Sequence, residues 1–131
     1  MTAQAGIDHT EILRRAYVDL RRLFETSHQA MYLYYDDMHK ICNDRFARLL
    51  GYDSPEEWSR VELPFTDEFV EAGASTEALV NAYRAAQQHF IASCVDVNWL
   101  TKQGETVPTR TILVPYVRGE DVYALHFIQG R

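Results

Sequence analysis

The chain has 131 residues, a net charge of −6 at pH 7 and a hydrophobic fraction of 47%. This length and hydrophobic content predict one compact globular unit that buries a core without disulfide or metal support. The negative charge, without any Lys- or Arg-rich run, argues against binding to nucleic acid or to anionic membranes. The sequence has neither a secretory-signal pattern nor an apolar stretch of membrane-spanning length, so we expect a cytoplasmic protein.

The two cysteines, Cys42 and Cys94, lie far apart in the sequence. Neither belongs to a Cys-x-x-Cys pair, so neither a disulfide framework nor a zinc site is indicated. We expect both side chains to be buried thiols.

The first predicted element is an amphipathic helix. Residues 8–11 form an Asp-His-Thr-Glu capping box, which predicts a helix N-terminus. Leu13, Tyr17, Leu20 and Phe24 follow at spacings of four, three and four, which puts them on one face. A helix of this length is only marginally stable alone in water, so another surface must cover its apolar stripe. Two interpretations are open: the stripe packs in the core of its own chain, or it pairs with a second copy in a dimer.

A β-hairpin and a short helix follow. Residues 29–35 are rich in Tyr and Leu and predict a strand, residues 36–37 predict a turn, and residues 38–42 predict the partner strand. The side-chain oxygen of Asn43 can then cap a helix. Gly51 is expected to end that helix, because glycine accepts the left-handed backbone found just past a helix end.

Further helices are predicted in the middle of the chain. Ser54, followed by Pro-Glu-Glu, predicts a second short helix through a capping box with Pro at the first helical position. Residues 61–65 predict a loop, and Thr66 is expected to cap a single turn. Ser75 is expected to cap a longer helix. The residues that share one apolar face of this helix are Leu79, Ala82, Tyr83, Ala86 and Phe90.

From residue 92 onward the apolar residues alternate with period two, which is typical of strands. A turn at residues 102–105 separates the first of these strands from a second at residues 107–117. A turn at residues 118–121 then leads to a last strand at residues 122–128. Both rows of side chains on the last strand are apolar, and such a sheet must be covered on both faces. We expect the middle helices to cover one face and the N-terminal helix the other.

Two segments resemble motifs of the PAS family, whose members are small sensory and protein-interaction modules. The first is residues 43–52, where an Asn leads into a helix that ends at Leu-Gly-Tyr, and the second is the closing hairpin around residues 99–105. The resemblance covers residues 29–128 and implies an α+β fold: a five-stranded antiparallel sheet with short helices on one face and an N-terminal flanking helix. We expect residues 1–27 to form the flanking helix and residues 28–131 to form the PAS-like domain.

The resemblance also implies a sensory role in signal transduction. Such modules often bind a small molecule between the sheet and its helices, contact a signalling partner protein, and form homodimers through the flanking helix, here through the stripe from Leu13 to Phe24. The residues that would line a ligand pocket are Phe46, Leu50, Tyr83, Ala86, His89, Phe90, Trp99, Leu113 and Leu125. The alternative interpretation is that these side chains simply fill the core.

The sequence does not identify a cofactor. The light-sensing flavin branch of the family has an Asn-Cys-Arg-Phe motif, whereas this chain has Asp44 at the position of the reactive cysteine, so a flavin adduct is not expected. Haem-binding members place an axial histidine on the longer helix, where His89 lies, but a lone histidine is weak support and haem is not expected. No metal site is predicted, because the remaining histidines lack partners at metal-ligand spacing. These histidines are His9, His28, His39 and His126. The last of them is expected to face the N-terminal helix or solvent.

The alternative function is that of a small isomerase-like enzyme with the cone-shaped α+β fold of ketosteroid isomerase. Asp96 as a base, with Tyr83 or Tyr123 as a hydrogen-bond donor, could supply its chemistry. Asp96 alternates with Val95 and Val97, however, and is therefore expected to face solvent. No hydrolase, metalloprotease, phosphate-loop or dinucleotide-binding motif is present in the sequence. We therefore expect a module that is not an enzyme.

Overall fold

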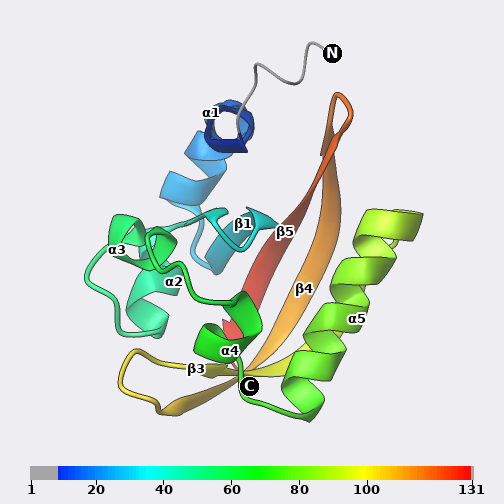
Figure 1. Cartoon of the computed structure of the whole chain (residues 1–131). Helices are drawn as coiled ribbons and strands as arrows, with labels where there is room; N and C mark the ends of the chain where they lie inside the picture. The colour runs from blue at the N-terminus through cyan, green and yellow to red at the C-terminus, as the bar shows by residue number, and fades with distance from the viewer. Residues whose placement is uncertain (1–8, 131) are drawn as a thin grey trace.

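The structure of the protein, a computed structural model, describes residues 9–130. These residues form one antiparallel sheet with helices on both of its sides (Figure 1). In chain order the elements are α1 (His9–Thr26), β1 (Ala30–Asp36), β2 (His39–Cys42), α2 (Asp44–Leu49), α3 (Pro55–Ser59), α4 (Phe65–Phe69), α5 (Ala74–His89), β3 (Ser93–Leu100), β4 (Thr106–Arg118) and β5 (Asp121–Gly130). The cap expected from Asp8 lies outside the described residues.

All neighbouring strands are antiparallel, and their order in the sheet is β2-β1-β5-β4-β3. Strand β5 therefore lies at the centre, between β1 and β4. In this register Tyr32 of β1 pairs with His126 of β5, and Leu113 of β4 pairs with the same histidine from the other side. The five-stranded antiparallel sheet predicted from the sequence is confirmed.

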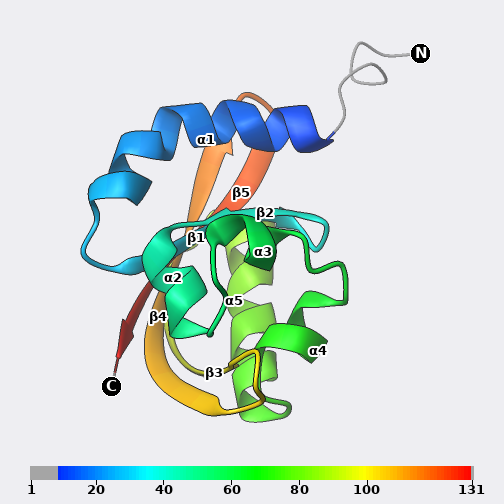
Figure 2. The same ribbon diagram turned by 90° about the vertical axis from the view of Figure 1, so that its left-hand side faces the viewer.

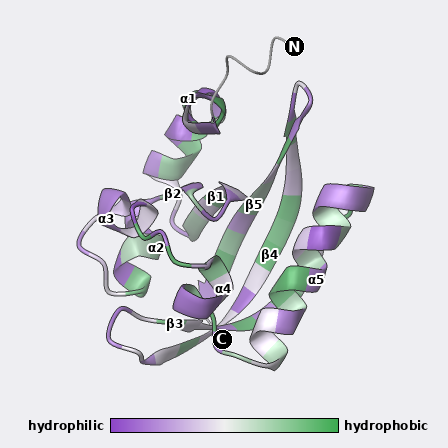
Figure 3. Ribbon diagram, viewed as in Figure 1, coloured by the Kyte–Doolittle hydropathy of each residue, from purple (hydrophilic) through white to green (hydrophobic). Residues whose placement is uncertain are grey.

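The sheet is covered on both faces, as the two apolar rows of the last strand predicted. On the inner face, Ala124 and Ile128 of β5 belong to a cluster of buried residues shared with α2, α3, α4 and α5. On the outer face, Tyr123 and Leu125 of β5 belong to a second cluster, shared with α1. Figure 2 shows α1 on one side of the sheet and the other helices on the opposite side. In Figure 3, green, apolar residues lie along the middle of β4 and β5.

No helix in the described part of the chain combines the length and the apolar character that crossing a bilayer requires.

The junction between the hairpin and the short helices follows the sequence signals. Asn43 caps α2, since its Oδ1 accepts a hydrogen bond from the backbone nitrogen of Phe46 at 3.1 Å. Gly51 adopts a positive φ of 83° just past the end of α2. Ser54 caps α3, since its Oγ accepts from the backbone nitrogen of Glu57 at 3.1 Å. Both predicted caps are confirmed.

Two other predicted caps are wrong. Helix α4 begins at Phe65, one residue before Thr66, so the threonine lies inside the helix and makes no cap. Helix α5 begins with Gly73 as its N-cap, at a φ of 95°, and no side chain caps it. The hydroxyl of Ser75 instead accepts a hydrogen bond from the backbone nitrogen of Asn98 at 2.8 Å, because the first turn of α5 packs against β3.

The two cysteines differ in burial. Cys42 is buried, as expected, whereas Cys94 is exposed. The expectation for Cys94 was wrong because the alternation along β3 places it in the same solvent-facing row as Asp96.

Candidate functional site

A cavity of about 200 Å³ lies between the inner face of the sheet and helices α4 and α5. Strand β1 contributes Tyr32 and Tyr34 to its wall, β5 contributes His126, and α5 contributes Tyr83. The remaining lining residues are Asp37, Phe65, Thr66, Leu79 and Val80. A mainly apolar wall with a few polar groups is the usual form of a small-molecule site.

His126 is the central polar group of this cavity. It is 2% exposed and stacks on Tyr32, with 3.8 Å between the ring centroids and 13° between the ring planes. Burial lowers the pKa of His126 from 6.5 to about 3, so the imidazole is neutral at pH 7. Its Nδ1 lies 3.1 Å from the carbonyl oxygen of Ala124. Because a carbonyl oxygen only accepts, Nδ1 carries the hydrogen and Nε2 is left as a hydrogen-bond acceptor.

The expectation that His126 faces α1 or solvent was therefore wrong. The register pairs it with Leu113, which belongs to the inner face, and side chains of directly paired residues lie on the same face of a sheet. The two faces of β5 are both apolar, so the periodicity of the strand alone did not decide which row faces inward.

The other polar groups of the cavity are tyrosine hydroxyls. The hydroxyl of Tyr34 donates to Oδ1 of Asp37 at 2.5 Å, and burial together with this contact raises the pKa of Tyr34. Burial also raises the pKa of Tyr32, so its hydroxyl keeps its hydrogen. Tyr83 of α5, which is half-buried, brings a third tyrosine to the cavity. The cavity wall thus combines three tyrosines with the neutral imidazole of His126.

Tyr32 also connects the cavity to the aromatic core. The ring centroids of Phe46, Trp58 and Trp99 lie 4.8, 5.6 and 5.7 Å from that of Tyr32. All three side chains are 0% exposed. A molecule that displaces Tyr32 would therefore disturb the centre of the core.

The nine residues predicted to line a pocket do not lie together. Tyr83 lines the cavity. Leu125 lies on the outer face against α1, so its assignment to the inner pocket was wrong. His89 is exposed at the last position of α5. Phe90 is exposed because the chain becomes left-handed there, with a φ of 57°, and leaves the helical period. The other five residues fill the core of the inner face: Phe46, Leu50, Ala86, Trp99 and Leu113.

The stripe predicted as a dimer interface faces the sheet of its own chain. Leu13 and Phe24 are buried against the outer face, and Tyr17 and Leu20 are partly buried beside them. This arrangement favours the interpretation of α1 as a core helix. The larger apolar side chain that α1 leaves most exposed is Val18, which is 60% exposed.

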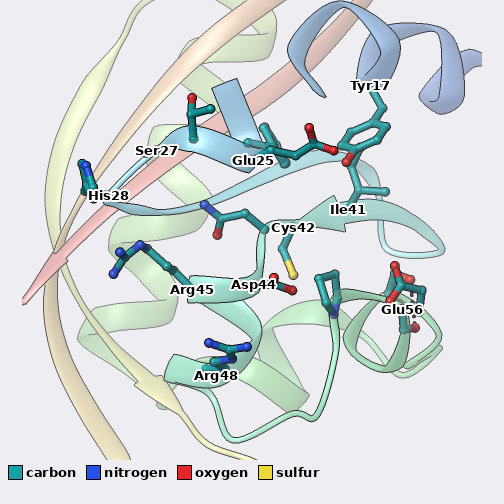
Figure 4. Close-up of a pocket in the computed structure, with 15 residues that line it drawn as sticks. Tyr17, Glu25, Ser27, His28, Ile41, Cys42, Asp44, Arg45, Arg48 and Glu56 are labelled. Atoms are coloured by element: carbon teal, nitrogen blue, oxygen red, sulfur yellow. Dashed lines mark hydrogen bonds between the residues drawn. The ribbon is translucent and has the colours of Figure 1, made fainter. Parts of the chain in front are cut away.

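A larger groove, of about 820 Å³, lies on the surface between α1 and helices α2 and α3 (Figure 4). Figure 4 shows Arg45 and Arg48 of α2 along it, with Glu25 of α1 and Glu56 of α3 also in its wall. Charged groups of both signs share this open surface, so it presents no single charge to a ligand. We therefore place the candidate ligand site in the smaller aromatic cavity.

The residues of the isomerase-like alternative do not meet. Asp96 is exposed, as predicted, and one of its carboxylate oxygens lies 3.4 Å from Nε of Arg110. Tyr83 lines the inner cavity, whereas Tyr123 lies on the outer face of the sheet. A base and a donor at these positions cannot act on one substrate, so this alternative is not favoured.

The sequence did not predict one cluster of potential metal ligands. His9 and His39 both contact Asp36, each through Nδ1 at 2.7 Å. The sequence was expected to offer these histidines no partner at metal-ligand spacing, but the docking of α1 brings His9 to a residue 27 positions away. The spacing of three between Asp36 and His39 across a predicted turn was the one available signal.

Comparison with known proteins identifies the fold. No family model matches the chain, and no curated protein matches it by sequence. Several solved structures match it. The PAS domain of a two-component sensor histidine kinase is 13% identical with a TM-score of 0.65, over 90% of this chain and 98% of that one. The PAS domain of a protein from Colwellia psychrerythraea is 18% identical with a TM-score of 0.65, over 92% of this chain and 97% of that one. The LOV protein of Rhodobacter sphaeroides is 17% identical with a TM-score of 0.68, over 89% of this chain and 67% of that one.

These matches and the antiparallel sheet define the fold as α+β, with a single five-stranded sheet. The protein has the PAS fold, and the resemblance inferred from its sequence is confirmed.

Proposed function

We propose that the protein is a sensory module, without enzymatic activity, that binds a small molecule in the cavity between β1, β5, α4 and α5 and transmits the occupancy of this cavity to a partner. The observation that carries the proposal is the stacked pair of His126 and Tyr32, which forms part of the cavity wall and belongs to the two strands that support α1.

The size and chemistry of the cavity limit the ligand. A dry protein cavity of about 150 Å³ binds benzene, so a cavity of about 200 Å³ suits a molecule of about one ring. Nε2 of the neutral His126 accepts a hydrogen bond, so the ligand should carry a donor such as a hydroxyl. Aromatic walls favour a flat, largely apolar body through stacking and edge contacts.

The same two strands connect the cavity to α1. Successive side chains of a strand point to opposite faces, so Tyr32 and His126 face the cavity while Leu33 and Leu125 face α1. The Tyr123 hydroxyl also donates to a carbonyl oxygen of α1, that of Ile12, at 3.0 Å. A ligand that separates the stacked rings would shift β1 against β5 and so change the surface on which α1 packs.

Helix α1 is therefore the proposed output element. Its stripe from Leu13 to Phe24 is covered by its own sheet, so a homodimer that used this stripe would require α1 to leave the sheet. A dimer or partner contact on the docked helix would instead use the exposed Val18 and Leu23.

The proposed ligand site can be tested with phenol, a single ring with one hydroxyl donor, and with toluene, which lacks the donor. Phenol should bind the purified protein and raise its Tm, and toluene should bind more weakly. Leu79→Phe, which adds bulk at the buried cavity wall, should weaken phenol binding about tenfold, which corresponds to about 1.4 kcal/mol. The matched control is Leu23→Phe on the exposed side of α1, which should bind phenol like the wild type.

Mass spectrometry under non-denaturing conditions checks for a natural ligand at the same time. Extra mass that is lost on denaturation, and that Leu79→Phe no longer carries, would support the cavity as the site. If the protein carries no extra mass and the Tm responds to neither probe, the proposed ligand site is overturned and the protein is better described as an interaction module.

A further inference from the structure

We propose that His9, Asp36 and His39 form a binding site for one divalent transition-metal ion. The three residues come from three different elements: His9 is the first residue of α1, Asp36 the last of β1 and His39 the first of β2. The inference does not depend on the ligand cavity, which lies on the inner face of the sheet.

The donor atoms already converge. One oxygen of Asp36 lies 2.7 Å from Nδ1 of His9, and the other lies 2.7 Å from Nδ1 of His39. The two imidazole centroids are 5.2 Å apart, and one ligand atom from each residue lies within 4.8 Å of the others. In a tetrahedral site with metal–nitrogen bonds of about 2.0 Å, the ligand atoms are about 3.3 Å apart. Small rotations of partly exposed side chains are enough to reach that geometry.

Two imidazoles and one carboxylate suit Zn²⁺, and also Cu²⁺ or Ni²⁺, whereas Mg²⁺ and Ca²⁺ prefer oxygen ligands alone. The side chains of His9, Asp36 and His39 are 51%, 37% and 26% exposed, so an ion can reach them from solvent. With three protein ligands, a water molecule would complete a tetrahedral shell.

The surroundings of the cluster hold its ligands in place. Asp36 Oδ1 accepts a hydrogen bond from the backbone nitrogen of Met38 at 3.0 Å, which orients the carboxylate. The ring of His9 packs edge-on against Tyr35, with 4.9 Å between centroids. The pairing of Asp36 with His39 across the β1–β2 turn fixes the distance between these two ligands.

Metal binding would replace hydrogen bonds of this cluster by coordinate bonds, and it involves no oxidation or reduction. In the metal-free protein each imidazole can donate an Nδ1 hydrogen to a carboxylate oxygen of Asp36. A metal ion bound at Nδ1 requires that nitrogen to give up its hydrogen to solvent and Nε2 to hold the ring hydrogen, retained or taken from water, so the two hydrogen bonds are replaced by coordinate bonds.

A bound ion would fasten the start of α1 to the β1–β2 hairpin. Because α1 packs on the outer face of the sheet, this link would hold the helix in its docked position. Metal availability would thereby control how freely the proposed output element moves.

Titration of the purified full chain with Zn²⁺ tests this site. We expect one ion per chain by calorimetry, and a rise in Tm of about 5 to 10 °C when free Zn²⁺ exceeds its Kd about 100-fold. A chelator should reverse the rise. Co²⁺ should bind in place of Zn²⁺ and give the visible absorption of a tetrahedral nitrogen and oxygen site.

His39→Ala and Asp36→Asn should each weaken Zn²⁺ binding more than about 100-fold, since even loss of a residue that only orients a ligand costs about 10- to 100-fold. The matched control is His89→Ala, which removes an exposed histidine far from the cluster in sequence and should bind like the wild type. Binding that survives His39→Ala, or the absence of binding to the wild-type chain, would overturn the proposal.

Discussion

At the scale of single residues, Asn43 makes three hydrogen bonds at the junction between the hairpin and the helices. Its Oδ1 accepts from the backbone nitrogens of Met31 and Phe46, both at 3.1 Å, and its Nδ2 donates to the carbonyl oxygen of Gln29 at 2.9 Å. The side chain is buried, with 6% exposure. It therefore acts as a cap for α2 and as a brace between β1 and β2.

Asn43→Ala should lower the free energy of unfolding by about 2 to 4 kcal/mol. The loss combines a helix cap, at about 1 kcal/mol, with the cost of leaving the buried backbone nitrogen of Met31 unpaired and the loss of the hydrogen bond to Gln29. Urea denaturation measures it. Ser54→Ala removes a cap that makes a single hydrogen bond and should cost only about 1 kcal/mol. Equal losses in the two variants would show that the brace contributes nothing.

The lowered pKa of the buried His126 makes the stability of the fold depend on pH. Its pKa is 6.5 in the unfolded chain and about 3 in the folded protein, so between these values the unfolded chain binds more protons. The contribution of His126 to the free energy of unfolding is therefore fully present above about pH 6.5. It is lost as the pH drops toward 3, by up to about 1.4 kcal/mol per pH unit.

His126→Phe should remove this contribution and flatten the fall in stability between pH 6.5 and pH 4.5. Phenylalanine keeps a ring against Tyr32 but cannot take up a proton. Unfolding curves at several pH values compare the slopes of the two proteins, and the exposed His89→Ala serves as control. A variant with the wild-type slope would show that other groups produce the pH dependence.

At the scale of elements, α1 is a structural part of the domain as well as its flanking helix. Leu13 is 8% exposed, Ala16 0% and Phe24 3%, and all three contact the outer face of the sheet. The outer face would otherwise expose Met31 and Leu33, which are both fully buried. The helix and the sheet therefore stabilise each other.

Leu13→Ala should destabilise the protein by about 3 kcal/mol, because it removes a buried side chain from the contact between α1 and the sheet. Val18→Ala, on the exposed side of the same helix, should change stability by less than about 0.5 kcal/mol. Thermal unfolding distinguishes the two. A small effect of Leu13→Ala would mean that α1 is not docked on its own sheet in solution.

At the scale of the whole molecule, the sequence predicted the order of the elements and the two-sided sheet because both follow from local periodicity. It did not predict which row of β5 faces inward. Leu113 pairs with His126 and not with Leu125, and a shift of one residue in register moves every side chain to the opposite face. Since both rows are apolar, only the three-dimensional pairing of the strands decides between them.

The site was predicted less completely for the same reason. Tyr83 was identified because it lies on the buried face of a long helix, where the periodicity is reliable. Tyr32 and His126 form the cavity wall only through the pairing of β1 with β5, which are far apart in sequence. Phe90 was misplaced because its backbone turns left-handed at the end of α5, where helical spacing no longer applies.

The aromatic core also gives the protein an intrinsic fluorescence signal that reports on the state of the core. The chain has two tryptophans, Trp58 and Trp99, and both are 0% exposed and in ring contact with Tyr32. Buried indoles fluoresce at shorter wavelengths than hydrated ones, so the native emission should be blue-shifted and should move to the red on unfolding. A molecule that displaces Tyr32 should change this emission without any added dye, while an event confined to the surface should leave it unaltered.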